Sequence, residues 1–310
     1  MHEGADATKS MGGPSALALL AVVVANVALA FGPWFVREAD TGPVAAAFWR
    51  MALSLPFIAA LAWRAGARPV GLDRGLWWLL LLSGVAFAAD LASWHLGIRR
   101  TTLANSTLFG NTATLLFPLY GFLVARAWPT RQQGFAFVLA LVGAALLMGR
   151  SLDVDPRRLT GDLLCVLAGV LYTLYFVIMT RVRETMGALS ALALSTAAST
   201  GPLLLFALML GERVWPEAWG ALIGLALASQ VLGQGCMVYA LGKLSPLVVG
   251  LALLVQPVVA ATVGWLVYDE RLGTADLAGA ALVAVALVLV ARARVAEPHA
   301  RAHLVAEEAR

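Results

Sequence analysis

Ten apolar runs, separated by charged or turn residues, follow one another along almost the whole chain. They span residues 14–34, 43–64, 76–97, 102–125, 132–149, 161–181, 189–210, 217–241, 245–267 and 274–292. A helix of about 20 apolar residues is long enough to cross a bilayer. The pattern therefore predicts an all-α integral membrane protein with ten transmembrane helices. Connectors such as residues 241–244 are so short that neighbouring helices must run antiparallel.

The composition excludes a soluble protein. Residues of the set AVILMFWYC make up 61% of the 310 residues, and charged residues make up 13%, against roughly 25% in ordinary globular domains. The mean hydropathy is +0.83. Ten spans of about 20 residues leave roughly 110 residues for tails and connectors, so no extramembrane domain fits. The net charge of +4 is then a property of the connectors and does not indicate a nucleic-acid partner.

The distribution of Lys and Arg predicts the orientation of the chain. If both tails and the even-numbered connectors share one side of the membrane, that side carries 13 of these residues and the other side carries 8. The more basic side is usually cytoplasmic. We expect a multi-pass protein of a bacterial-type inner (plasma) membrane with both termini in the cytoplasm. Arg150, Arg157 and Arg158 fall on the outer side and count against this orientation.

The chain repeats itself weakly. Residues 89–106 align with residues 228–245 without gaps at an offset of 139, which also places Pro118 on Pro257. We expect a first five-helix repeat over residues 1–149 and a second over residues 150–310, the latter with a cytoplasmic tail. Because five is odd, the second repeat must be inverted relative to the first. Inverted repeats are a common plan of secondary transporters, which bind substrate near the midplane.

Several short motifs resemble a known family, the EamA-type members of the drug/metabolite transporter superfamily. They are Phe48-Trp49-Arg50, Pro118, Gly161-Asp162-Leu163-Leu164, Leu244-Ser245-Pro246, Pro257 and Asp269-Glu270-Arg271-Leu272, and the resemblance runs from about Ala16 to Arg294. It implies two inverted five-helix repeats, no bound cofactor and transport of small metabolites, most often export of amino acids. The acidic pair at Asp269 has no counterpart after the fifth span, where Trp128-Pro129-Thr130 stands.

Two charged residues, Arg50 and Asp90, lie inside apolar spans. Charge is costly in hydrocarbon, so both are candidate functional residues. Each lies about seven residues, or ~10 Å, from the outer end of its span, so the two can meet. They could form a buried structural ion pair. Alternatively, Asp90 could exchange a proton for substrate while Arg50 binds a substrate carboxylate.

Aromatic residues and one histidine are further candidates for a site near Arg50 and Asp90. Trp94 shares a helical face with Asp90, and together with Tyr172 it is a candidate for the wall of a binding cavity. Further candidate wall residues are Trp49, Tyr120 and Tyr175. His95 could relay protons for coupling, or could be only an anchor at the level of the lipid headgroups.

Intramembrane amides and prolines form a further group. The amides are Asn105, Asn111, Gln230, Gln234 and Gln256. Hydrogen bonding between helices accounts for most such residues; Asn111 and Gln256, near mid-depth, are the predicted substrate contacts. Pro118 and Pro257 each remove a helical hydrogen bond, and their kinks could be hinges or plain packing features.

Three classes of function are compatible with the composition: a metabolite transporter, a lipid-carrier translocase of the same fold, and a membrane-embedded enzyme. The last is disfavoured because the spans hold no metal motif and no paired acids. His299 and His303 in the polar tail are two ligands without a third, so no metal site is predicted. Cofactors are not expected. The expected partners are a small-molecule substrate and the lipid bilayer, with a monomer as a possible state.

Overall fold

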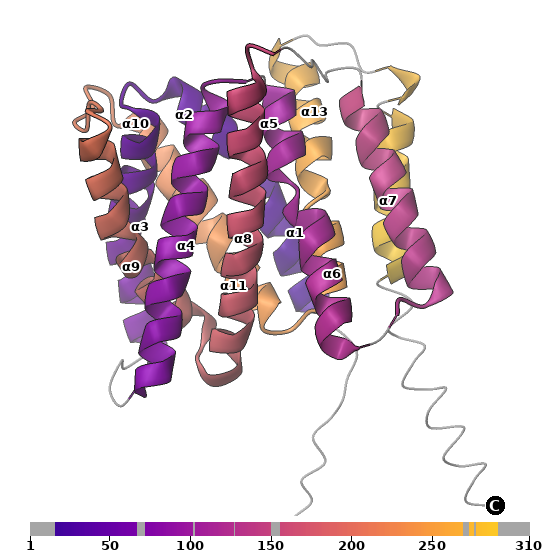
Figure 1. Cartoon of the computed structure of the whole chain (residues 1–310), viewed down its shortest axis with the longest axis horizontal. Helices are drawn as coiled ribbons and strands as arrows, with labels where there is room; N and C mark the ends of the chain where they lie inside the picture. The colour runs from indigo at the N-terminus through magenta and orange to yellow at the C-terminus, as the bar shows by residue number, and fades with distance from the viewer. Residues whose placement is uncertain are drawn as a thin grey trace, which may run out of the picture.

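The computed structural model of the chain describes residues 16–66, 72–101, 103–126, 128–149, 156–268, 273–275 and 277–290. These residues form helices and no strand, and the helices stand side by side in one bundle (Figure 1). Within the described residues, seven helices are long and apolar enough to cross a membrane, and three shorter apolar helices accompany them. The all-α fold of membrane-spanning helices is confirmed, whereas ten crossings stay a prediction. Residues 269–272, His299 and His303 lie outside the described residues.

The elements follow the predicted runs in order. In the first half they are α1 (Ala16–Ala30), α2 (Gly32–Glu38), α3 (Pro43–Arg64), α4 (Arg74–Ile98), α5 (Leu103–Gly110), α6 (Ala113–Ala125) and α7 (Arg131–Gly149). In the second half they are α8 (Leu159–Thr185), α9 (Ala188–Met209), α10 (Gly220–Gly224), the π-helical η1 (Leu225–Gln234), α11 (Gly235–Leu241), α12 (Pro246–Ala252) and α13 (Val255–Tyr268). An apolar helix over Leu277–Val290 follows.

Three predicted runs contain interruptions. The α5–α6 break at Asn111 and Thr112 follows Gly110, and Gly and Asn are residues at which helices commonly end. The α12–α13 break covers residues 253–254. Pro257 explains this second break. Its ring would clash with the carbonyl group of Leu253, four positions earlier, and it has no N–H group to donate to that carbonyl. The first run is broken at residue 31 between α1 and α2.

Equivalent helices of the two halves run in opposite directions. The Gly42 backbone N–H, just before α3, donates to the Arg213 carbonyl just after α9 (3.0 Å). The start of α3 therefore lies at the end of α9, and these packed helices are antiparallel. In the order of elements, α1 corresponds to α8, α3 to α9, and α4 to η1 and α11. The packing of α4 on α8 therefore corresponds to that of α11 on α1, and the packing of α4 on α9 to that of η1 on α3. Each contact recurs with the two halves interchanged, as expected for two inverted repeats.

The register between the halves differs from the predicted offset of 139. Helices α4 and α11 end 143 residues apart, at Ile98 and Leu241, and α6 and α13 begin 142 apart, at Ala113 and Val255. The predicted offset was wrong by about one helical turn. A shift of four residues returns a helix to nearly the same face, so the apolar pattern of the two halves still matched. Pro118 and Pro257 are therefore not equivalent positions.

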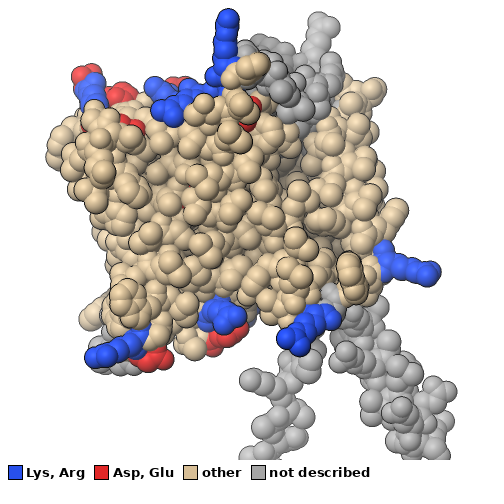
Figure 2. Space-filling model, viewed as in Figure 1, with Lys and Arg blue, Asp and Glu red and all other residues tan. Residues whose placement is uncertain are grey.

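The outer surface of the bundle fits a lipid environment. On the face shown in Figure 2, nearly all charged side chains gather along two opposite edges, and the band between them is uncharged. Large apolar side chains such as Leu20, Leu82, Leu119 and Leu205 are at least half exposed. Exposed apolar surface of this extent is unfavourable in water and is expected in hydrocarbon.

Connectors fasten one edge of the bundle. The Asp40 carboxylate accepts hydrogen bonds from the backbone N–H groups of Glu217 (2.6 Å) and Ala218 (3.2 Å), and the bond from Glu217 is the main cause of a lowered pKa of Asp40. The Glu212 carboxylate accepts from the Ala45 N–H (2.8 Å). Partial burial raises the pKa of Glu212. These contacts join the start of α3 to the connector after α9.

Candidate functional site

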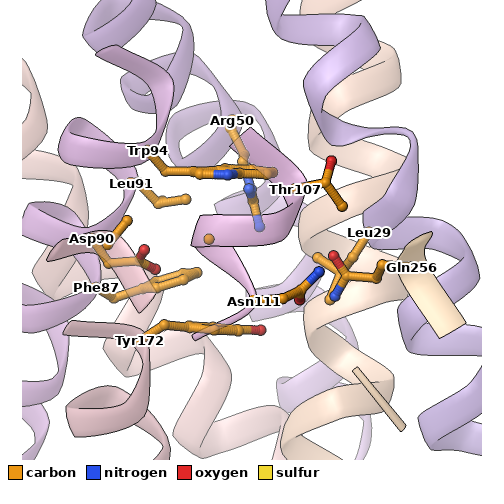
Figure 3. Close-up of a pocket in the computed structure, with 12 residues that line it drawn as sticks. Leu29, Arg50, Phe87, Asp90, Leu91, Trp94, Thr107, Asn111, Tyr172 and Gln256 are labelled. Carbon is orange, nitrogen blue, oxygen red and sulfur yellow. The ribbon is translucent and has the colours of Figure 1, made fainter. Parts of the chain in front are cut away.

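A cavity inside the bundle lies between the two halves of the chain (Figure 3). It encloses about 490 Å³, counting the space at its open side. Six of its lining residues are the six predicted substrate contacts, Arg50, Asp90, Trp94, Asn111, Tyr172 and Gln256. The other six are Leu29, Phe87, Leu91, Thr107, Gly110 and Ala168. The structure thus brings all the predicted contacts to one cavity.

Each half of the chain contributes elements to this cavity. In α4, Phe87, Asp90, Leu91 and Trp94 are spaced three to four residues apart and therefore share one helical face. Helices α1, α3 and α5 add the other helical lining residues of the first half, and α8 and α13 supply those of the second. The α5–α6 break brings Asn111 to the cavity, and Gln256 follows the α12–α13 break.

Arg50 and Asp90 share the cavity without pairing. Their side chains are 2% and 6% exposed. Among the described residues, neither makes an ion pair with an N···O distance of 4.0 Å or less, and no hydrogen bond joins Asp90 to another described side chain. The arrangement seen here is therefore not the buried structural pair that the sequence left open. The two opposite charges face one space, where each can be solvated by water or by a ligand.

Arg50 is held by Gln230, which does not line the cavity, and lies near the ring of Phe87, which does. Its Nε–H donates to the Gln230 side-chain oxygen (3.1 Å), and its Cζ atom lies 5.8 Å from the centre of the Phe87 ring. The Nη1 and Nη2 groups have no hydrogen-bond partner among the described residues. These groups therefore remain available to bind an anion in the cavity.

Aromatic rings bound the cavity on two sides. Figure 3 shows Trp94 on one side, the rings of Phe87 and Tyr172 on the opposite side, and Asp90 between them. Trp94 is wedged between two glycines: a Cβ atom on Gly110 would lie 2.9 Å from the indole Nε1, and one on Gly32 would lie 3.2 Å from the ring. The Tyr172 hydroxyl donates to the Gln234 side-chain oxygen (3.1 Å). The cavity therefore offers ring faces to an apolar part of a ligand.

The two cavity amides differ in their contacts. The Gln256 Nε2 group donates to the Asn26 Oδ1 atom (2.9 Å), and Asn26 donates to the Val22 carbonyl (2.7 Å). Asn111 makes no side-chain hydrogen bond with another described residue. Asn111 can thus act as donor or acceptor toward a ligand, whereas Gln256 has already committed one donor.

Several predicted residues lie away from the cavity. His95 is fully buried and its Nδ1 atom is 2.9 Å from the Pro43 carbonyl oxygen, while Nε2 has no partner in the described chain. It is therefore not a surface anchor, and a proton-relay role stays a prediction. Trp49 packs against Trp215 and Trp219 at the fastened edge, 5.3 and 4.9 Å between ring centres. Neither Tyr120 nor Tyr175 lines the cavity.

The two predicted hinge prolines have different surroundings. Pro118 lies inside α6 and packs on α12, where a Cβ atom on Gly250 would lie only 2.5 Å from the proline ring. Pro257 is the third residue of α13, within its first turn, where a helix tolerates proline best. The two prolines therefore occupy different places in the helices of the two halves. A hinge role for either proline stays a prediction.

Half of the residues that line the cavity were not predicted from the sequence. Leu29, Leu91 and Ala168 are ordinary apolar residues in apolar spans, and Thr107 carries no distinguishing pattern. Phe87 could have been found, because it lies one turn from Asp90. Asn26, the partner of Gln256, is also an amide within an apolar run and carried the same signal as the amides that were noted. No group of three or more His, Cys, Asp or Glu side chains suited to a metal occurs among the described residues.

Comparisons with known proteins agree with this architecture. The sequence model of the EamA-like transporter family matches residues 16–149 and again residues 159–292, two matches displaced by 143 residues. A curated protein of Archaeoglobus fulgidus, called an uncharacterized transporter, is 26% identical over 241 residues, which cover 76% of this chain and 82% of that protein. One solved crystal structure superposes with a TM-score of 0.75 at 14% identity, over 90% of this chain and 96% of that chain. At such identity the structural likeness concerns the fold alone.

Proposed function

Since this chain belongs to the EamA-like transporter family, we propose that it is a secondary transporter that exports small zwitterionic metabolites, amino acids or related compounds, from the cell. The family and the similar archaeal protein point to a membrane transporter rather than an enzyme. The chemistry of the cavity supports the proposed substrate class, small zwitterionic metabolites. In this proposal the chain crosses the inner membrane ten times, with both termini in the cytoplasm.

One observation carries the substrate class: Arg50 and Asp90 face the same cavity without pairing with each other. A guanidinium with free Nη groups binds a carboxylate through charge-assisted hydrogen bonds, and a free carboxylate binds an ammonium group in the same way. A ligand that carries both groups satisfies both residues at once. The rings of Trp94 and Tyr172 then contact the side chain of the bound metabolite.

The breaks in two helices support an alternating-access mechanism. The α5–α6 and α12–α13 breaks occur at corresponding places in the two halves, and residues next to them, Asn111 and Gln256, line the cavity. Discontinuous helices at the interface of inverted repeats bind substrate near the midplane in many transporters. Movement of one half against the other would open the cavity to alternate sides.

A two-stage experiment tests the proposal. A thermal-shift screen of the twenty amino acids on purified protein identifies binders, because a ligand at a hundredfold excess over Kd adds about 2.7 kcal/mol to the apparent stability. Each binder is then loaded, with a radioactive label, into proteoliposomes. We expect saturable efflux that the unlabelled amino acid inhibits and that Arg50→Gln abolishes.

The same liposomes contain a fluorescent lipid, which tests the alternative function of a lipid-carrier translocase. Scrambling of this lipid without amino-acid flux would show a lipid-carrier translocase and refute the proposal. Liposomes containing the Ser54→Ala variant are the matched control, because the Ser54 hydroxyl donates only within its own helix, to the Met51 carbonyl (3.0 Å).

A further inference from the structure

A short polar chain links the cavity to the second half of the protein. Gln230, in η1, contacts Arg50 through its side-chain oxygen and donates from Nε2 to the Thr196 hydroxyl on α9 (3.1 and 3.0 Å). All three side chains are at most 2% exposed. Neither Gln230 nor Thr196 lines the cavity, so a direct contact with a ligand is not their role.

The orientation of the Gln230 amide follows from its partners. The Arg50 Nε–H can only donate, so the amide oxygen must face it, and the amide nitrogen must then face Thr196. A hydroxyl can accept this hydrogen bond. The amide is therefore held at both ends, and through it the Nε edge of the guanidinium is fixed.

We propose that Gln230, oriented by Thr196, is a positioning residue that presents the Nη edge of Arg50 to a carboxylate group in the cavity. A guanidinium can bind a carboxylate through its Nε and one Nη group or through both Nη groups. Gln230 occupies Nε, which leaves only the second mode. The stretch that carries Gln230 is π-helical, and π-helical turns occur frequently at functional sites.

A neutral acceptor is required for this role. A carboxylate at position 230 would also accept from Nε, but it would form an ion pair with Arg50 and compete with a bound anion. The amide holds the guanidinium without neutralising it. Gln230→Glu is therefore an informative variant, because it retains the oxygen that contacts Arg50, and the Thr196 hydroxyl can turn to donate to the new carboxylate.

The first test is independent of any substrate. Phenylglyoxal modifies accessible guanidinium groups, and peptide mass spectrometry gives the rate at Arg50, with the half-exposed Arg213 as internal standard. The ion pair in Gln230→Glu should slow modification of Arg50 by about 10- to 100-fold, the range of a hydrogen bond to a charged group. An unchanged rate at Arg50 would overturn the proposal, because it would show that the side chain at position 230 does not hold the guanidinium.

The second test rests on the proposed function and uses L-leucine and L-leucinamide, which differ only in the carboxylate. Gln230→Glu should weaken binding of L-leucine by about 10- to 100-fold and leave the Kd of L-leucinamide unchanged. Equal weakening of both ligands would contradict a carboxylate subsite at Arg50. If neither ligand binds the wild type while Arg50 is still protected in Gln230→Glu, the substrate class fails and the positioning of Arg50 stands.

A second variant serves if Gln230→Glu does not fold. Thr196→Val frees one end of the amide and should raise the Kd of L-leucine about 2- to 12-fold, the effect of one neutral hydrogen bond, without changing that of L-leucinamide. The matched control is Ser199→Ala on the same helix, where the lost hydroxyl donates only to the Ser195 carbonyl (2.8 Å). Wild-type affinity for L-leucine in Thr196→Val would refute the role of Thr196.

Discussion

Removal of the Asp90 charge distinguishes between two interpretations of Arg50 and Asp90: residues of a binding cavity, or a structural ion pair. Removing one partner of a buried ion pair leaves the other charge uncompensated, at a cost of about 3–5 kcal/mol. At ~2–4 °C per kcal/mol, that cost would lower the thermal midpoint by about 6–20 °C. In the structure Asp90 has no partner among the described residues, so Asp90→Asn creates no new unpaired charge. We expect its thermal midpoint to stay within about 2 °C of the wild type.

Arg50→Gln should behave differently. It removes the hydrogen bond between Nε and Gln230, which is one to a charged group and worth about 1.5–3 kcal/mol. The expected fall in the thermal midpoint is about 3–12 °C. The stability of the two variants is therefore unequal, whereas a structural pair predicts similar losses for both.

The assay combines size-exclusion profiles and thermal midpoints in detergent with proteoliposome flux between pH 5 and pH 8. We expect both variants to lose transport, and the pH dependence of any residual flux to flatten only in Asp90→Asn. A strongly destabilised Asp90→Asn, partly rescued by exchanging the two residues, would refute the cavity interpretation. Folded variants with unchanged flux would place the binding site elsewhere.

Three further predictions concern other parts of the chain. Gly110→Ala should reduce flux, because the new methyl group would lie 2.9 Å from the Trp94 indole, and Trp94→Phe in the same chain should restore part of the lost flux. Because backbone hydrogen bonds lower the pKa of Asp40, its contribution to stability is complete above the unfolded-state pKa of about 3.9 and is lost as the pH falls through the folded-state pKa. Between pH 5 and pH 3 the thermal midpoint of the wild type should therefore fall more than that of Asp40→Asn, and parallel curves would contradict this. A cytoplasm-active reporter fused after Arg310 should be active and a periplasm-active one silent, and the reverse result would contradict a cytoplasmic C-terminus.

The sequence predicted the features that the bilayer imposes. Apolar runs long enough to cross hydrocarbon can hardly be anything but helices, and their bounds agree with the observed helices to within a few residues. Arg50 and Asp90 were found because charge is rare and costly in such runs. Their matched depth depended only on helical rise, and the structure places both at one cavity.

Features set by packing between distant segments were not predicted. The pairing of Gln256 with Asn26 joins α13 to α1 across 230 positions of sequence, and nothing local distinguishes these amides from any other. The repeat offset was wrong by one turn, since apolar periodicity constrains the face of a helix but not its position along the axis. The burial of His95 was not predicted for a related reason: it depends on the start of α3, whose Pro43 carbonyl His95 contacts.

The energetics of Arg50 and Asp90 constrain what the cavity contains. Two opposite charges at this burial would normally approach until they pair, because each alone has a large desolvation penalty. Here the Nε side of Arg50 is held by Gln230, and Asp90 lies on another helix with no partner among the described residues. A polar occupant that solvates both groups stabilises an arrangement of this kind. Water can do so, and a zwitterion that displaces this water replaces hydrogen bonds with one charged partner by hydrogen bonds in which both partners are charged. Under the proposed function, the same geometry that keeps the two residues apart gives the cavity its affinity for a ligand with two opposite charges.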